Sequence, residues 1–225
     1  NITSKFQEPP LIVKILFKVL SFSFTRRTKI TMNKDEGERL SNSLESMGTT
    51  FIKLGQFLAT RPDIIGEELS KKLENLQDKL PPFSQSEAKE IIRKDLGEDT
   101  YNSITNLSDP VAAASIAQVH KAQISDNGII KDVAIKILRP NIKKIFNTEI
   151  DAMMLFAFLV ESFLKKTKRL KLVEVVFLLK EITNLEMDLR FEAAAANEYS
   201  ENTKNDAGFR VPQIYWNFTS ENVMT

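Results

Sequence analysis

The chain has 225 residues, of which 42% are apolar and 27% are charged, and its formal net charge is +1. This composition is ordinary for a globular protein, and the near-neutral charge argues against a strong electrostatic attraction to nucleic acid. The chain has no cysteine and one histidine, His120. Disulfides, thiolate metal sites and zinc sites built from several histidines are therefore excluded from it.

An apolar stretch near the start of the chain runs from Pro9 to Phe24 and is interrupted by Lys14 and Lys18. It falls short of the roughly 20 apolar residues that span a bilayer. We expect a helix packed on the domain, and the alternative is an interfacial helix that lies on a membrane.

Residues 1 to about 105 have the pattern of a helical region. Apolar residues recur at helical spacing over 35–60 and 66–80, and Pro81 and Pro82 end the second segment. A third helix is expected to begin at Ser84 or Ser86 and to end at Gly97.

One helix in this region combines polar residues with a glycine. At about 100° per residue, a narrow stripe is formed by Thr49, Lys53, Gln56 and Thr60. Gly55 lies on the apolar side, where we expect it to let another backbone approach closely. The stripe either faces solvent or points into a shared polar pocket.

The pattern changes after residue 105. Residues 114–124 and 131–138 are rich in β-branched side chains, and the turn sequence Ser125–Gly128 lies between them. We predict an antiparallel hairpin whose second strand ends before Pro140. Small residues at 112–115 lead into the first strand, as in a loop that lets backbone N–H groups approach a ligand, but their spacing alone favours a tightly packed turn.

Two long helices are predicted next, near 141–166 and 171–203. Ile214, Trp216 and Phe218 then alternate as in a strand, and 223–225 begin another strand. A strand at the very end has no room for a supporting element, so we expect the chain to be incomplete as a functional unit.

Lys136 shares its predicted strand face with Ala134 and Leu138. A lysine on an apolar face must either extend to solvent or meet an anion. A lysine in a "VAIK" strand does the latter in kinases, where it pairs with nucleotide phosphates and a helical glutamate.

The last long helical segment is acidic. Asp188 and Glu192 lie four residues apart on one face, whereas Glu186 faces elsewhere. The segment is either a solvated face with Glu186 partly balanced by Arg190, or Glu186 and Glu192 each meet a lysine from another element. His120 is interpreted as a packed or solvent-facing strand residue rather than a catalytic base.

From about Leu40 onward, these motifs together resemble the UbiB family of atypical protein-kinase-like proteins, which is linked to ubiquinone biosynthesis. "KLGQ" (53–56) is similar to the family's KxGQ motif, and "AAAS" (112–115) to its Ala-rich loop. "VAIK" (133–136) and "EMD" (186–188) are similar to its lysine strand and its ExD motif. Four motifs in the family's order are far more specific than any one of them.

The resemblance implies an α+β fold in which a helical KxGQ extension, residues 1–105, packs on a kinase-like N-lobe, residues 106–225, with the C-lobe absent. It implies that Lys136 contacts the nucleotide phosphates and pairs with Glu192, that Lys53 pairs with Glu186, and that Gln56 reaches toward the nucleotide. The residues it assigns to nucleotide binding are Lys53, Gln56, Val111, Ala112, Ala113, Ala114, Ser115, Ile116, Ala117, Gln118, Val119, Lys136, Glu186, Asp188 and Glu192.

The resemblance also implies binding and hydrolysis of ATP with Mg2+, by an atypical kinase or ATPase that acts with ubiquinone-pathway proteins and lipid precursors. It implies a cytoplasmic location or peripheral contact with the inner membrane, and no nucleic acid. The catalytic-loop and metal-binding residues of a kinase belong to the C-lobe, so we expect no catalytic residue or metal ligand in this chain and no activity of the chain alone. The alternatives are a non-catalytic module that binds lipid, membrane or a partner, or a non-functional gene remnant.

Overall fold

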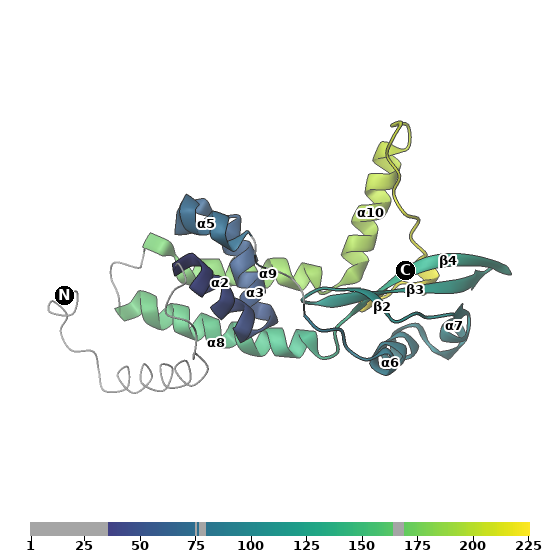
Figure 1. Ribbon diagram of the computed structural model, residues 1–225, viewed down its shortest axis with the longest axis horizontal. Helices are drawn as coiled ribbons and strands as arrows, with labels where there is room; N and C mark the ends of the chain where they lie inside the picture. The colour runs from purple at the N-terminus through teal and green to yellow at the C-terminus, as the bar shows by residue number, and fades with distance from the viewer. Residues whose placement is uncertain (1–35, 75, 77–79, 164–168) are drawn as a thin grey trace.

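The computed structural model describes residues 36–74, 76, 80–163 and 169–225, so the stretch Pro9–Phe24 lies outside the described residues. The fold is α+β as predicted, with one group of helices at one end of an elongated molecule and a small antiparallel sheet, flanked by the other helices, at the other end (Figure 1). The main helices are α2 (Glu36–Met47), α3 (Thr49–Ala59), α4 (Pro62–Ile65), α5 (Glu67–Leu73), α6 (Gln85–Leu96), α7 (Glu98–Asn102), α8 (Ile142–Phe163), α9 (Leu172–Glu186) and α10 (Leu189–Thr203). The strands are β1 (Ile104–Thr105), β2 (Pro110–Ala113), β3 (Ala117–Asp126), β4 (Ile129–Leu138) and β5 (Val223–Met224).

The long helices α8 and α9 run side by side, and α2, α3 and α5 cover one side of them (Figure 1). The buried residues of α8 recur every three or four positions, which is the spacing of one helical face: Ile142, Phe146, Ile150, Met153 and Ala157. Phe51, Leu54 and Phe57 of α3 pack against the same cluster. The apolar stripe of α3 is thus used to hold its polar stripe in place.

Two predicted helices are interrupted. Gly48, with φ 110°, separates α2 from α3, a backbone conformation that favours glycine. The prediction of one helix over 171–203 is wrong, because the chain leaves the helix at Met187 and Asp188 and starts again at α10. The Asp188 side chain accepts the backbone N–H of Arg190 and so caps the new helix.

The strand order is β1-β3-β4-β5, and β2 also pairs with β3. The predicted hairpin is confirmed: β3 and β4 join at Asn127 and Gly128, whose φ values of 50° and 79° fit a tight two-residue turn. The pairing puts four residues in one row across the sheet: Ala112, Val119, Lys136 and Met224.

The two faces of β4 have different neighbours. Ile135 and Ile137 are fully buried and pack with Ala88 and Ile92 of α6, whereas Lys136 points to the opposite face. The helix α6 has the predicted ends, with a capping box between Ser84 and Glu87 and a C-cap at Gly97. It therefore supports the sheet from the side away from Lys136.

The strand predicted around Ile214–Phe218 is not formed; residues 216–218 form a short 3-10 helix instead. The segment folds back on the end of the chain, where Tyr215 N–H donates to the Thr225 carbonyl at 2.8 Å and Ser220 N–H to the Val223 carbonyl at 2.7 Å. These hydrogen bonds take the place of the strand-to-strand hydrogen bonds that a strand at 214–218 would make. The alternation of apolar residues there therefore reflects a turn packed against β5. The predicted final strand is present as β5.

Candidate functional site

The first pair of the site joins the sheet to α10. The ammonium group of Lys136 donates to both carboxylate oxygens of Glu192, at 2.7 and 2.6 Å. α10 is attached to the sheet next to this pair, because Leu189 N–H donates to the Glu221 carbonyl at 3.0 Å. The two side chains are 28% and 49% exposed, so the lysine is oriented by the pair but remains reachable by an anion from solvent.

The second pair joins the KxGQ helix to α9. Lys53 of α3 lies 2.7 Å from the carboxylate of Glu186, the last residue of α9, and is only 14% exposed. Both pairings expected from the resemblance are therefore found. Gln56 lies one turn further along α3 and is half-buried, and its side chain makes no hydrogen bond to the part of the chain that is described.

The role expected for Gly55 is corrected by the packing of α3. A Cβ atom at this position would meet Leu76, and would lie 2.9 Å from the Leu44 side chain. The glycine therefore makes room for side chains from α2 and from the residues after α5, not for another backbone. Leu44 and Leu76 are both buried in the small core that fixes α3 on its outer side.

The Ala-rich loop is divided between strand and turn. Val111 to Ala113 belong to β2, Ala114 to Ile116 form the turn, and Ala117 starts β3. The turn is closed by Ala114 N–H, which donates to the Ala117 carbonyl at 2.8 Å. The Thr49 hydroxyl, at the start of α3, donates to the Ser115 carbonyl at 3.4 Å. The KxGQ helix thus begins beside the Ala-rich loop.

Gln118 lies on the other face of the sheet and is fully buried. Its amide accepts from Phe83 N–H at 2.9 Å and donates to the Phe83 carbonyl at 3.2 Å. It also lies 2.9 Å from His120 Nε2, while His120 Nδ1 lies 2.8 Å from the Ser108 carbonyl. A carbonyl only accepts, so Nδ1 carries the proton and Nε2 accepts from Gln118. Of the two expected placements, His120 takes the packed one, with both ring nitrogens bonded.

Asp188, from the ExD motif, is held by its neighbour two residues on. The Arg190 guanidinium donates to both carboxylate oxygens, at 2.9 and 2.7 Å, and this pairing lowers the pKa of Asp188 from its ordinary value. Burial opposes this shift, and the backbone N–H of Arg190 and the charge of Lys143 add to it. Arg190 therefore balances Asp188, not Glu186 as one interpretation of the sequence had it.

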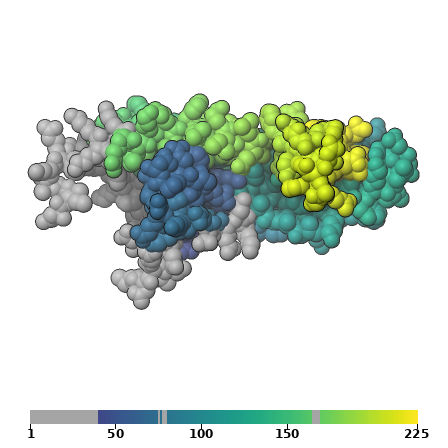
Figure 2. Space-filling view, turned by 90° about the horizontal axis from the view of Figure 1, so that it is seen from above, coloured from purple at the N-terminus to yellow at the C-terminus, as the bar shows by residue number. Residues whose placement is uncertain are grey.

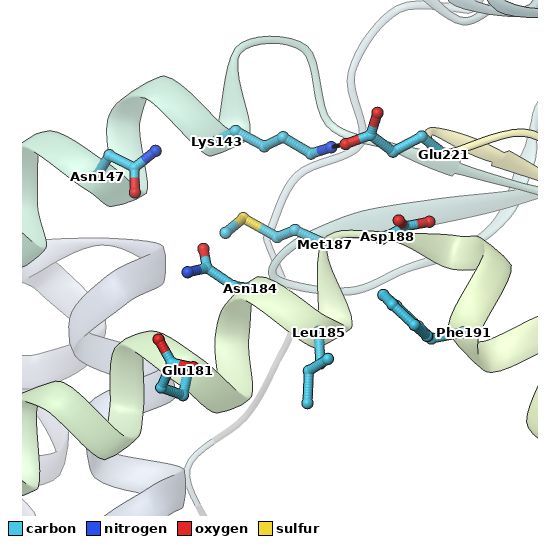
Figure 3. Close-up of a pocket in the computed structure, with 9 residues that line it drawn as sticks. All are labelled: Lys143, Asn147, Glu181, Asn184, Leu185, Met187, Asp188, Phe191 and Glu221. Carbon is cyan, nitrogen blue, oxygen red and sulfur yellow. Dashed lines mark hydrogen bonds and ion pairs between the residues drawn. The ribbon is translucent and has the colours of Figure 1, made fainter.

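A pocket of about 380 Å3 lies where α8, α9 and α10 meet the turn before β5 (Figure 3). An ion pair between Lys143 and Glu221 spans its upper edge, with the Met187 side chain below it in this view. Of the predicted site residues, Asp188 alone lines this pocket. Sequence reasoning missed Lys143 and Glu221, which lie 78 positions apart and carry no local motif.

The described residues contain no group of three histidine, cysteine, aspartate or glutamate side chains placed to hold a metal ion. Across the same described ranges, no helix is long and apolar enough to cross a membrane. The contacts described above bring together two oriented lysines, their carboxylate partners and a small-residue loop.

Comparison with known proteins decides the family. The ABC1 atypical kinase-like domain matches residues 75–225 of the chain. The chain belongs to the ABC1 atypical kinase-like family. This ABC1 chain is 36% identical over 218 residues to a protein of Marinobacter nauticus described as "Probable protein kinase UbiB", a match that covers 96% of the chain. The resemblance to UbiB proteins is thus confirmed.

Two further relatives carry the same description. One, from Vibrio cholerae serotype O1, is 37% identical over 194 residues, or 85% of this chain. The other, from Azotobacter vinelandii, is 35% identical over 187 residues, or 83% of this chain. The chain spans only 34 to 39% of the length of these three relatives.

Proposed function

We propose that this ABC1 chain supplies the ATP-phosphate-binding face of a UbiB-type atypical kinase or ATPase that supports ubiquinone biosynthesis. The observation that carries the proposal is the bidentate ion pair between Lys136 and Glu192. It aims an ammonium group along the face of the sheet on which Ala112 and Val119 also lie, in register with Lys136. A lysine so held is a donor for phosphate oxygens.

The surroundings of Lys136 fit a nucleotide. Ala112, on the same face as Lys136, has a small, exposed side chain, which leaves room for phosphates against the strand. Lys53 and Gln56 approach from α3, which begins at the loop, and would cover the nucleotide from that side. When bound, ATP would supply the phosphoryl group, and the residues of this chain would bind and orient it.

The remaining parts of the proposal follow from the family. Mg2+ would be held mainly by the nucleotide phosphates, because the described residues lack a cluster of metal ligands. ATP hydrolysis, ubiquinone-pathway partners, lipid precursors and peripheral membrane contact would belong to the whole protein. The division into a helical extension up to residue 105 and an N-lobe from 106 also remains a proposal.

ATP binding by the purified chain tests this proposal. Lys136→Ala should weaken ATP affinity at least about tenfold, because the phosphates lose a charged donor. Lys131→Ala is the matched control: Lys131 lies on the same strand, near the hairpin turn, and pairs with Asp126 at 2.9 Å. It should bind ATP like the unaltered chain. Equal ATP affinity in the Lys136→Ala variant and the unaltered chain would count against the assigned role of the lysine.

A second candidate function, a binding module, is favoured by one observation. Large apolar side chains are exposed on α8 and α9, whose surface forms one long side of the helical part (Figure 2). They are Ile145, Leu155, Phe156, Phe158, Phe163, Phe177, Leu178, Ile182 and Leu185. Surfaces of this kind serve as interaction sites.

Co-sedimentation with lipid vesicles separates the two candidates. A lipid-binding module should sediment with vesicles without ATP, and Phe156→Ser with Phe158→Ser should abolish this. A chain that stays in the supernatant with every vesicle composition loses the lipid form of the second candidate. The ATP titration is unaffected by either result.

A further inference from the structure

Arg139, the residue that follows β4, grips the Ala-rich loop from two sides. Its guanidinium donates to the Ala114 carbonyl from Nε at 3.0 Å and from Nη2 at 2.8 Å. Its backbone N–H donates to the Ile116 carbonyl at 2.8 Å. One residue therefore fixes both ends of the three-residue turn.

These bonds decide which way the loop carbonyls point. The Ala114 and Ile116 carbonyls accept from Arg139, and the Ser115 carbonyl between them accepts from the Thr49 hydroxyl. Carbonyl oxygens carry partial negative charge and repel phosphate, whereas N–H groups attract it. A loop suited to phosphate must have its carbonyls held by donors of the protein, and all three carbonyls of this turn are so held.

The same guanidinium reaches a distant part of the chain. Nη1 donates to the Pro81 carbonyl at 2.9 Å, Nη2 lies 3.3 Å from the Leu80 carbonyl, and the group stands 5.9 Å from the centre of the Phe83 ring. Pro81 and Phe83 lead into α6, which supports the sheet from below. The loop is therefore anchored to the segment that leads into α6.

We propose that Arg139 is a positioning residue, which holds the Ala-rich loop with its carbonyls turned away from the bound phosphates. The guanidinium suits this task because it is planar, always charged and rich in donors, whereas a lysine ammonium cannot reach the same set of carbonyls at once. The inference rests on the proposed function, in which the loop covers the nucleotide.

Hydrogen exchange of the full chain without nucleotide tests whether Arg139 holds the Ala-rich loop, independently of ATP binding. In Arg139→Met, which keeps the length of the side chain but not its donors, the amides of residues 111–117 should exchange about tenfold faster while those of α8 stay unchanged. In Arg139→Lys, the exchange rate of the loop amides should lie between that of the unaltered chain and that of Arg139→Met. The matched control is Arg93→Met, because Arg93 stacks on Tyr101 at 4.5 Å and pairs with Glu98 at 3.0 Å, away from the loop.

Unchanged loop exchange in the Arg139 variants would overturn the proposal. If Arg139→Met does not melt cooperatively, the same comparison is read from Arg139→Lys, which keeps the charge. ATP titration then separates this inference from the proposed function. Faster loop exchange together with about tenfold weaker ATP binding supports both. Faster exchange with unaltered ATP affinity overturns the positioning role, and absence of ATP binding in the unaltered chain overturns the proposed function while the exchange result still describes the clamp.

Discussion

At the scale of single residues, the pair of Lys136 and Glu192 should matter more for ATP binding than for the stability of the fold. The two side chains are 28% and 49% exposed, and pairs with this exposure contribute at most about 1 kcal/mol. Glu192→Gln should therefore lower the free energy of unfolding by less than about 1 kcal/mol, but weaken ATP binding about tenfold, because the lysine loses its orientation.

Chemical denaturation of Glu192→Gln measures its free energy of unfolding, and ATP titration measures its ATP affinity. Glu201→Gln is the control on α10, since Glu201 pairs with Lys204, at 3.3 Å, near the far end of that helix. A loss of stability that accounts for the whole loss of affinity would mean that Glu192 holds the fold and not the lysine.

Asp188 gives a prediction about pH. Its pKa is lowered in the folded protein by Arg190, so ionised Asp188 stabilises the fold above its unfolded pKa of about 3.9, and this contribution is lost as the pH falls through the lower folded pKa. Asn caps a helix as well as Asp does, so Asp188→Asn removes the charge and keeps the cap. The difference in free energy of unfolding between the two proteins should shrink from about pH 5 to about pH 2.5.

Denaturant titration at a series of pH values measures this difference. Asp151→Asn, an exposed position on α8, should give no such pH-dependent difference. A difference that stays constant down to about pH 2.5 would mean that the ion pair with Arg190 contributes nothing to the fold.

At the scale of elements, the packing of α3 depends on Gly55. Gly55→Ala brings a methyl group against Leu44 and Leu76, which are both buried. The strain of overpacking, about 1 to 3 kcal/mol, exceeds the gain of about 1 kcal/mol in helix propensity. The variant should therefore be destabilised by about 1 kcal/mol.

A double mutant checks the cause. Together with Leu76→Ala, which opens space beside the glycine, Gly55→Ala should become neutral or stabilising. Thermal or chemical unfolding of the four proteins in this cycle gives the coupling. An equal loss with and without Leu76 would assign the effect to the backbone of α3 instead.

The elements that the sequence predicted well are those set by local chemistry. Asn127 and Gly128 specify a tight turn by themselves, and Ser84 with Glu87 specifies the start of α6. The break at Asp188 was missed, because acidic residues are also common inside helices and nothing nearby marks it as a cap. The strand expected at 214–218 failed because its alternation is read equally well as a turn packed on β5.

In the candidate site, too, some features could be predicted from the sequence and others could not. Lys53 and Lys136 were found with their partners, because motifs in a known order stand in for the distances of 133 and 56 residues that no local pattern spans. The contacts of Arg139 were not predicted, since they go to backbone carbonyls. Every residue has such a carbonyl, so the sequence does not indicate which ones will accept a bond. The burial of Gln118 follows from strand alternation with the fully buried Ile137 opposite it, but the network it makes depends on the approach of Phe83.

At the scale of the whole molecule, one buried network holds the segment before α6 against the sheet. Gln118 bonds both backbone groups of Phe83 and the Nε2 atom of His120, and the other ring nitrogen of His120 bonds the Ser108 carbonyl. Gln118 and His120 are fully buried, and Phe83 is half-buried. The network and the Arg139 contacts together tie residues 80–83 to the sheet. The bond from Thr49 to the Ser115 carbonyl joins the Ala-rich loop to α3, at the helical end of the molecule.

Gln118→Leu should destabilise the whole molecule. The substitution leaves Phe83 N–H, its carbonyl and His120 Nε2 without partners, and each unsatisfied buried group costs about 1 to 3 kcal/mol, so we expect a loss of at least about 3 kcal/mol. Gln123→Leu is the matched control on the same strand, because Gln123 bonds the side chains of Asn106 and Asp132 in a more exposed place and should cost less than about 1 kcal/mol.

Two probes of one denaturant titration decide whether the loss is shared. Trp216, the only tryptophan of the chain, reports on the region beside β5, and far-ultraviolet circular dichroism reports mainly on the helices. If residues 80–83 link the sheet and the helices into one cooperative unit, both transitions shift together in Gln118→Leu. A shift of the tryptophan transition alone would mean that the sheet and α6 unfold apart from α8 and α9, even though Ala117 and Leu138 of the sheet share a buried cluster with Phe146 of α8.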